Sequence, residues 1–237
     1  MGIRSTENIL VIASHPDDEV LGVGGTIAKK AMSGHDVFVV ILATGIAARY
    51  PNPELHAETI VSEIDRLKKD AEKAAETLKI KEMFFLDFPD NRLDTVPKMD
   101  LTFKLKQVID TVKPETVYIH HFGDYNWDHG IAFDVSLMAC RPNVGDFFPR
   151  RIYSYEVLSS SERSFQNSSN VFCPNVFENI RDTIEQKKNA LRCYTSESKP
   201  YPHPRSPEAV EYLARKRGIE VGLEFAEAFQ LIREINP

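Results

Sequence analysis

A histidine and three consecutive acids follow the first apolar stretch of the chain. The segment ILVIASHPDDEVLGVGG, residues 9–25, places His15, Asp17, Asp18 and Glu19 directly after a run of strand-forming residues. Three adjacent carboxylates repel one another, and burying them beside an apolar core costs free energy unless a positive group lies among them. One interpretation is that the acids open a helix, where negative charge is favourable. The other is that they bind a metal cation, with His15 as a further ligand.

The elements that must position these residues alternate between strand and helix patterns. Apolar runs rich in β-branched residues predict strands at 9–14, 36–44, 81–88, 115–121 and 151–158. Apolar residues at helical spacing predict helices at 55–78, 99–113 and 129–140. This order predicts an α/β fold, with a Rossmann-like, doubly wound, mostly parallel sheet that carries helices on both faces.

The pattern changes in the last third of the chain. Helices are predicted at 177–194 and in a segment that begins with Ser206 as its N-cap and stops at Gly218. No linker is long enough to demand a separate domain. The expected organisation is a single domain, 1–237, with a Rossmann-like core at 1–150 and a C-terminal cap at 151–237.

The loops after the first and fourth strands are expected to meet. Doubly wound sheets bind ligands beyond the carboxyl ends of their strands, where the first strand neighbours the fourth. The loop HFGDYNWDHG after the fourth strand would bring His129 to His15 and Asp18. Two imidazoles, one carboxylate and an open position form the donor set of a catalytic zinc site. The sequence therefore predicts Zn²⁺ there, with another divalent metal such as Fe²⁺ as the alternative, and leaves Asp17 free to face a metal-bound water.

Five segments resemble the LmbE/PIG-L family of zinc-dependent N-deacetylases. They are ASHPDDEVLGVGGTIA, FPDNRLD, GDYNWDHG, PHPRSPEAV and VGLEFAEAF. The resemblance implies that His15, Asp18 and His129 hold zinc and that Asp17 is the general base, with Asp128 as the next candidate. It also implies hydrolysis of an acetamide on an amino sugar or sugar conjugate, such as an N-acetylglucosamine derivative, by a zinc-bound water.

The sequence leaves alternatives for the residues that contact substrate, because this chain departs from the family pattern at two positions. Asn126 stands where many members have histidine, and the acid of a T-x-G-E motif is missing, so Arg49 is the candidate contact there. Arg49 could equally be a solvated loop residue. Trp127 is either one wall of the sugar pocket or a core plug. His203 and Arg205 either close over the substrate from the cap or belong to a rigid loop.

Two further histidines precede the second loop. His120 and His121 lie at the end of a predicted strand, where neighbouring side chains alternate between faces. At most one of them can therefore point toward the metal ligands.

Two rival functions remain. The fold and the glycines of GVGG, residues 22–25, are compatible with a dinucleotide-binding oxidoreductase. Those glycines follow the acids and do not spell G-x-G-x-x-G, so they favour close packing of a helix on the sheet. The other rival is a non-catalytic, sugar-binding relative that kept the fold.

Composition excludes several classes of partner. The 237 residues carry 29 basic and 35 acidic side chains, a net charge of −6, without a block of like charge that would bind nucleic acid. No apolar run approaches the roughly 18 residues of a membrane span. The three cysteines lack the spacing of a disulfide framework or a zinc ribbon. We expect a cytoplasmic protein whose partner is a small N-acetylated sugar or sugar conjugate; the sequence leaves a homo-oligomer open.

Overall fold

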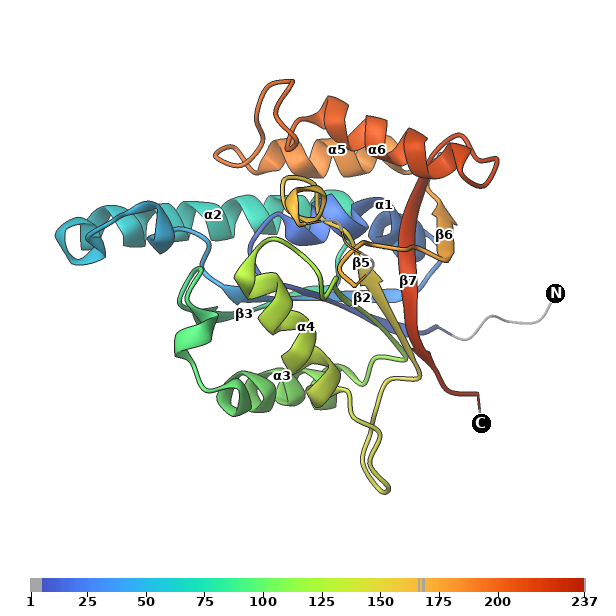
Figure 1. Ribbon diagram of the computed structural model, residues 1–237, viewed down its shortest axis with the longest axis horizontal. Coiled ribbons are helices and arrows are strands. Elements are labelled where there is room, and N and C mark those ends of the chain that lie inside the picture. Colours follow the sequence, from blue (N-terminus) through green and yellow to red (C-terminus); the bar gives the residue numbers. More distant parts are fainter. Residues whose placement is uncertain (1–5, 166, 168, 237) are drawn as a thin grey trace.

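One seven-stranded sheet, in the order β3-β2-β1-β4-β5-β7-β6, organises the computed structural model, which describes residues 6–165, 167 and 169–236 (Figure 1). The strands are β1 (Asn8–Ala13), β2 (Asp36–Ala43), β3 (Glu82–Phe88), β4 (Thr116–His120), β5 (Arg151–Tyr155), β6 (Val176–Asn179) and β7 (Ala226–Glu234). The α-helices are α1 (Asp18–Met32), α2 (Ala57–Leu78), α3 (Lys98–Val112), α4 (Trp127–Ala139), α5 (Ile184–Cys193) and α6 (Pro207–Ile219). Short 3-10 helices are η1 (Ala47–Arg49), η2 (Pro53–His56), η3 (Leu93–Thr95) and η4 (Ser161–Arg163).

The first five strands are parallel. β1 pairs with β2 on one side and with β4 on the other, and β3 and β5 extend the sheet outward from them. β7 and β6 add two antiparallel strands at one edge. The predicted fold class, a mostly parallel α/β sheet with β1 beside β4, is confirmed. The loops that follow β1 and β4 therefore leave the sheet next to each other.

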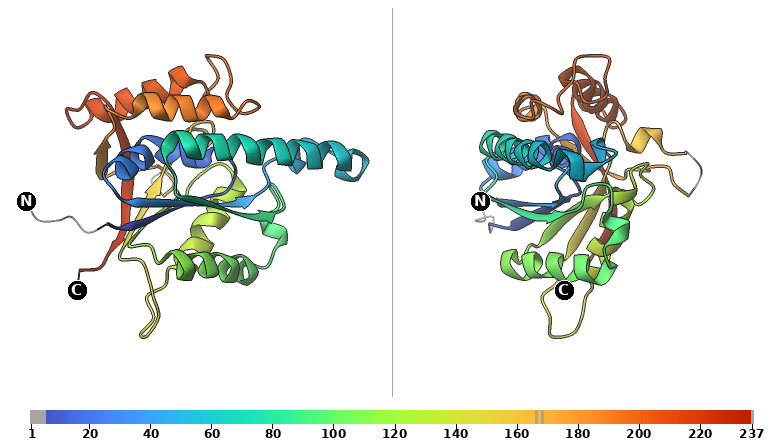
Figure 2. Two further views of the ribbon diagram at one scale, coloured as in Figure 1. Left: turned by 180° about the vertical axis from the view of Figure 1, so that it is seen from behind. Right: turned by 90° about the vertical axis from the view of Figure 1, so that its left-hand side faces the viewer.

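Helices cover both faces of the sheet. α1 and α2 lie on one face, with α5 and α6 stacked above them, and α3 and α4 lie on the other (Figure 2). Successive residues of β1 consequently enter different cores: Ile9 and Val11 pack toward α1 and α2, whereas Leu10 and Ile12 pack toward α3 and α4. Burial on both faces explains the uninterrupted apolar run that first marked this strand.

The C-terminal segment contains one element that the sequence assigned wrongly. Residues 177–194 were expected to form one helix, but β6 occupies the first part of this range and α5 begins only at Ile184. The reason is tertiary: β6 pairs antiparallel with β7, a strand that periodicity did not predict. Ser206 does cap α6, since its Oγ accepts the Ala209 N–H at 3.0 Å, and the helix passes Gly218 by one residue.

Glycines in α1 let this helix approach its neighbours closely. A Cβ on Gly22 would lie 2.2 Å from the ring of Tyr155 in β5, and a Cβ on Gly25 would lie 2.8 Å from Ile180. These residues thus pack against protein side chains, as expected from close packing of the helix. α1 begins at Asp18, so this packing also fixes the start of the helix relative to the sheet.

The 22-residue helix α2 is amphipathic. Its buried stripe includes Ile60, Leu67, Ala71, Ala74 and Leu78, while the opposite side is exposed. Within the described ranges of the chain, no helix combines the length and apolar character needed to cross a bilayer.

Candidate metal centre and active site

The turn between β1 and α1 presents His15 and Asp18 on the same side. The backbone N–H of His15 donates to Asp18 Oδ2 at 2.9 Å, which closes the turn. Asp17 lies between them in the left-handed region, with φ 106°. That backbone conformation is costly for a residue with a Cβ and is found most often at functional sites.

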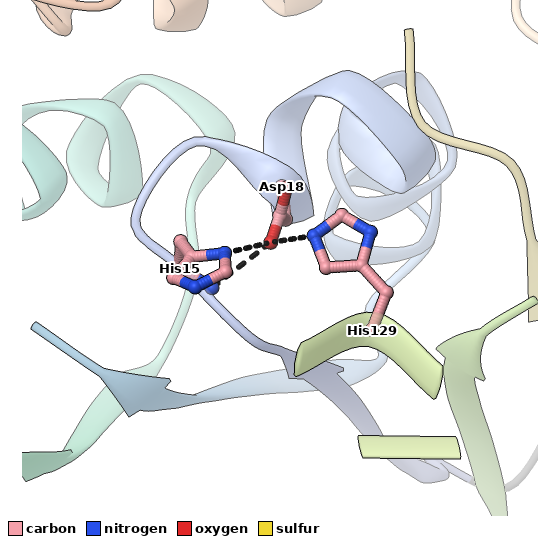
Figure 3. A group of neighbouring side chains, drawn as sticks. All are labelled: His15, Asp18 and His129. Atoms are coloured by element: carbon pink, nitrogen blue, oxygen red, sulfur yellow. Dashed lines mark hydrogen bonds and ion pairs between the residues drawn. The ribbon is translucent and has the colours of Figure 1, made fainter. Parts of the chain in front are cut away.

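His129, in the first turn of α4, completes a cluster of three potential ligands. Asp18 Oδ2 lies 3.4 Å from His15 Nδ1 and 3.2 Å from His129 Nε2. Figure 3 shows the Asp18 carboxylate between the two imidazole rings. One donor atom from each residue lies within 4.8 Å of the others, and all three side chains are largely buried. The loops after β1 and β4 thus bring together the residues that the sequence predicted as ligands.

Each imidazole also has a carboxylate at its other nitrogen. His15 Nε2 lies 3.0 Å from Asp128 Oδ2, and His129 Nδ1 lies 3.2 Å from Asp124 Oδ1. Metal-binding histidines commonly direct their second nitrogen at a carboxylate, which fixes the ring and strengthens it as a ligand. The residues therefore fit a divalent metal such as zinc at the Asp18 side of both rings.

Asp128 is held by several groups besides His15. Its carboxylate accepts the backbone N–H of Asn91 at 2.8 Å and of Leu93 at 3.1 Å. Asp90 Oδ1 lies 3.4 Å from His15 Nε2, so His15, Asp90 and Asp128 form a second group with metal-binding residue types. These two hydrogen bonds from backbone N–H groups fix the Asp128 carboxylate. A fixed carboxylate is better suited to orienting the His15 ring than to transferring a proton.

The charges in the cluster stabilise one another. Burial alone would lower the pKa of His15, but its hydrogen bonds with Asp128 and Asp18 outweigh burial and raise the pKa to about 10. Burial also opposes a charged His129, yet Asp18 and Asp124 raise its pKa to about 9. Burial would raise the pKa of Asp18, and the neighbouring imidazoles instead hold it well below its usual range. Such a site exchanges imidazole protons for a bound cation.

Asp17 and Glu19 have partners other than the three potential ligands. Asp17 Oδ2 lies 3.2 Å from Arg205 Nη1, but it accepts no hydrogen bond from any described residue. Burial raises the pKa of Asp17 well above its usual range, while the charge of Arg205 opposes this increase. Glu19 accepts the Asp17 backbone N–H at 3.1 Å and the Tyr194 hydroxyl at 2.5 Å, and burial raises the pKa of Glu19 to about 7.

A buried glutamate links two arginines beside Asp17. Glu197 accepts Arg49 Nη2 at 2.7 Å and Arg205 Nη1 at 2.8 Å. Arg205 also donates from Nε to Ser159 Oγ at 3.0 Å. Arg49 is 43% exposed at its side chain, yet it is anchored by Glu197 and is not a freely solvated loop residue. The C-terminal third of the chain therefore supplies charged groups to the loop after β1.

Asn126 and Trp127 start α4 at the mouth of the site. The Asn126 side-chain oxygen accepts the Asp128 N–H at 2.9 Å, so this residue is the N-cap. Among the described residues none accepts a hydrogen bond from its side-chain NH₂ group, which therefore remains able to donate to a ligand. Trp127 is 77% exposed, so the core-plug interpretation is wrong.

Of the remaining histidines, only His120 lies against the cluster. Its ring stacks on His129 at a centroid distance of 3.9 Å, and its Nε2 already accepts the Ser14 N–H at 2.9 Å. His121 points elsewhere and donates to the Asn170 carbonyl at 2.8 Å. The ring of His203 accepts the Arg205 N–H at 3.0 Å, but His203 lines neither of the two cavities at the site.

Two cavities flank the ligand cluster. A cavity of about 240 Å³ is lined by polar side chains and three small or proline residues: His15, Pro16, Asp17, Gly45, Ala48, Arg49, Asp90, Asn91, Asn126, Glu197 and Arg205. A cavity of about 420 Å³ is lined by Asn91, Tyr125, Asn126, Trp127, His129, Ser159, Ser160 and Arg205. The shared lining shows that the cavities adjoin, with His15 on one side and His129 on the other.

Several residues of the site were not predicted from the sequence. Asp124 stands in the quoted loop GDYNWDHG shortly before His129, so it was an available signal for a supporting carboxylate. Asp128 of the same loop was predicted only as an alternative base, not as the partner of His15. Glu19 was noticed only as one of three acids. Glu197 and Tyr194 carry no motif, because their approach to the first loop depends on how α5 packs over α1.

Comparisons with known proteins agree with this α/β fold and give the family of the chain. A family model described as GlcNAc-PI de-N-acetylase (PIG-L) matches residues 10–140. The chain belongs to this family of deacetylases.

One bacterial and one archaeal relative match this chain over most of its length. "Uncharacterized deacetylase YaiS" of Escherichia coli is 26% identical over 181 residues, which cover 74% of this chain and 83% of the relative. "Diacetylchitobiose deacetylase" of Thermococcus kodakarensis is 27% identical over 201 residues, which cover 82% of this chain and 71% of the relative.

A solved structure shows how widely the fold is used. The 4-carboxy-2-hydroxymuconate hydratase GalB from Pseudomonas putida superposes with a TM-score of 0.77, 22% identity and 98% coverage of both chains. At this identity the likeness shows the fold alone, so chemistry must be argued from the site.

Proposed function

We propose that this protein is a metal-dependent N-deacetylase that removes the acetyl group from an amino sugar or sugar conjugate. The observation that carries this proposal is the cluster of His15, Asp18 and His129, with a carboxylate behind each imidazole. Membership of a deacetylase family supports the reaction, and the name of the diacetylchitobiose-acting relative supports an N-acetylated sugar as substrate.

His15, Asp18 and His129 would hold the metal through two nitrogens and one oxygen, which favours zinc over magnesium or calcium. A zinc ion at such a site polarises an amide carbonyl and lowers the pKa of a coordinated water to about 7. Asp124 and Asp128 keep the imidazole rings in place, through His129 and His15 respectively.

Asp17 is the group best placed to move a proton. Asp17 lines the polar cavity, and its Oδ2 accepts no hydrogen bond from the described residues and is paired in charge with Arg205. A raised pKa brings a carboxyl group closer to neutral pH, where it can both accept and return a proton. In this proposal Asp17 takes the proton of the attacking water and later delivers it to the departing nitrogen.

Asn126 is proposed to stabilise the developing charge on the amide oxygen. Capping of α4 fixes its side chain, and its NH₂ group is turned to neither Asp128 nor another described acceptor. A fixed amide donor can supply oxyanion stabilisation without transferring a proton. Arg49 and Arg205 are proposed to contact the sugar in the polar cavity.

The proposal is tested by acetate release from a panel of N-acetylated sugars, sugar nucleotides and glycolipid head groups. We expect release from one class, loss of release with a chelator, and recovery on adding zinc or Fe²⁺, which also identifies the preferred metal. Absence of acetate release from every member by the metal-loaded protein would contradict the function.

Replacement of His129 links the metal to the activity. His129→Ala should lower metal content and acetate release together, since two remaining ligands hold zinc poorly, while circular dichroism still reports a folded chain. Lys104→Ala, a change at an exposed position of α3, is the control and should retain the metal. Full metal occupancy in His129→Ala would exclude this ligand set.

A further inference from the structure

A pair of exposed aromatic side chains borders the candidate active site. Tyr125 is 62% exposed and Trp127 is 77% exposed, and both line the 420 Å³ cavity. Neither ring stacks on another ring within the part of the chain that the structure describes. Solvent-exposed aromatic surface next to a cavity is unfavourable in the free protein and typically marks a binding site.

Hydrogen bonds fix the backbone segment that carries these two aromatic residues. Asp124, just before Tyr125, accepts the Asn126 N–H at 2.9 Å and hydrogen bonds from Ser160 and Ser161. Trp127 is the first residue of α4. Both rings therefore stand on a segment fixed by the same loop that positions His129.

The two cavities differ in the chemistry of their walls. The smaller one offers charged and amide groups from Arg49, Asp90 and Asn91, which match sugar hydroxyls. The larger one adds two rings, whose faces match the apolar face of a second ring. Ligand sites usually span roughly 300–1,000 Å³. The 240 Å³ polar cavity alone is smaller than this range, whereas the two adjoining cavities together fall within it.

We propose that the larger cavity is a second subsite, in which Tyr125 and Trp127 bind a ring attached to the amino sugar. The inference rests on the proposed deacetylase function and narrows its substrate to a two-ring glycoside. The amino sugar lies among the polar groups near Asp17, its acetamide lies at His15 and His129, and the second ring extends over α4. The second ring is a further sugar or an aryl group, since both present an apolar face.

Trp127 is the only tryptophan of the chain, so its fluorescence reports on this subsite directly. The full-length protein is titrated with three unacetylated amines that cannot be deacetylated: glucosamine, its β-linked glucosamine disaccharide, and phenyl β-glucosaminide. We expect a two-ring amine to change Trp127 fluorescence, which glucosamine alone leaves unchanged. Isothermal titration calorimetry gives the affinities, and the two-ring amine should bind on the order of 10-fold more tightly than glucosamine. The arm that shows the gain identifies the second ring as sugar, aryl or either.

Tyr125→Ala should abolish most of this gain and leave glucosamine binding unchanged. Phe103→Ala is the matched control, because Phe103 is equally exposed at 59% but lies on α3 and lines neither cavity. Equal affinity for one-ring and two-ring amines, no binding of any of them, or a gain that survives Tyr125→Ala would each overturn the subsite.

Measurement of acetate release distinguishes failure of the second subsite from failure of the proposed deacetylase function. Release from free N-acetylglucosamine without any fluorescence preference for two rings rejects the subsite and keeps the deacetylase. A clear preference for two rings without acetate release from any glycoside rejects the deacetylase and keeps a ring-binding subsite.

Discussion

At the scale of single residues, three adjacent acids of one turn meet three different environments. Asp18 lies between two imidazoles, Asp17 faces Arg205, and Glu19 is buried against the Tyr194 hydroxyl. Asp17 and Asp18 therefore have different partners, although the two residues are neighbours in the chain. The interpretation that these acids open a helix is confirmed, since Asp18 and Glu19 start α1. The place of Asp18 between two imidazoles supports the interpretation as a metal ligand.

Exchange of each aspartate for asparagine should separate metal binding from proton transfer. Asp17→Asn keeps the shape and tolerates the left-handed backbone, so it should retain metal while kcat falls roughly 10²–10⁴-fold for a lost general base. Asp18→Asn should instead lose metal, because a neutral amide replaces an anionic ligand. Metal analysis and single-substrate kinetics distinguish them. Equal metal loss in both variants, or normal turnover in Asp17→Asn, would refute these separate roles.

The carboxylate behind His129 should act through metal affinity. Asp124→Asn removes the charge that fixes and polarises the His129 ring, so we expect zinc affinity to fall roughly 10- to 100-fold. Competition with a chromophoric chelator measures this affinity without any substrate. Asp134→Asn, which changes an exposed acid on the same helix α4, is the control. Unchanged zinc affinity in Asp124→Asn would remove the orienting role.

The site residues that could be predicted from the sequence are chemically distinctive residues in loops that follow neighbouring strands. His15, Asp18 and His129 fall into this class, because strand order alone brings the two loops together. Glu197 does not: an acid in a loop near residue 200 has no sequence relation to a turn near residue 17. Its position depends on the packing of α5 over α1, which the sequence pattern does not encode locally.

At the scale of elements, close contact between α1 and the sheet sets the position of the turn that carries Asp18. Gly22 permits this contact, since its Cα faces the ring of Tyr155, whose hydroxyl donates to the Ile12 carbonyl at 2.7 Å. The first five strands could be predicted because each is an apolar run between turn residues. β7 could not, since AEAFQLIRE has no clear two-residue alternation and its pairing with β5 is long-range.

An added methyl group should show how tightly α1 is packed. Gly22→Ala places a Cβ 2.2 Å from the Tyr155 ring, so we expect the free energy of unfolding to fall by roughly 1–3 kcal/mol through overpacking. Gly130→Ala in α4 is the matched control, because its Cβ would meet nothing closer than 3.8 Å and a helical alanine is favourable. Urea denaturation compares the two. Equal stability of both variants would contradict the close approach.

At the scale of the whole molecule, the site is assembled from the early, middle and late parts of the chain. The turn after β1 and the loop after β4 supply the candidate ligands, and the segment between α5 and α6 supplies Glu197 and Arg205. This segment lies above α2 in the layer of helices that covers one face of the sheet (Figure 1). The same architecture also occurs in a hydratase, so the groups brought in by these loops, rather than the sheet, determine the chemistry.

Removal of Arg205 should therefore alter Asp17 from the opposite end of the chain. Burial raises the pKa of Asp17 and the positive charge of Arg205 counteracts that increase, so Arg205→Ala should raise this pKa further. Because the base must be ionised, the acidic limb of the kcat/KM profile should move to higher pH, with bound metal unchanged. At neutral pH, kcat/KM should fall roughly 10- to 100-fold through loss of a charged contact.

Two further variants decide whether charge is the cause. Arg205→Lys keeps the positive charge and should return the acidic limb toward its original pH, whereas a purely structural role for the guanidinium would leave the limb displaced. Arg192→Ala removes an arginine of α5 that donates to Asn189 on its own helix, and the pH profile should stay unchanged. An acidic limb that does not move in Arg205→Ala would show that the 3.2 Å contact with Asp17 does not set the ionisation of the proposed base.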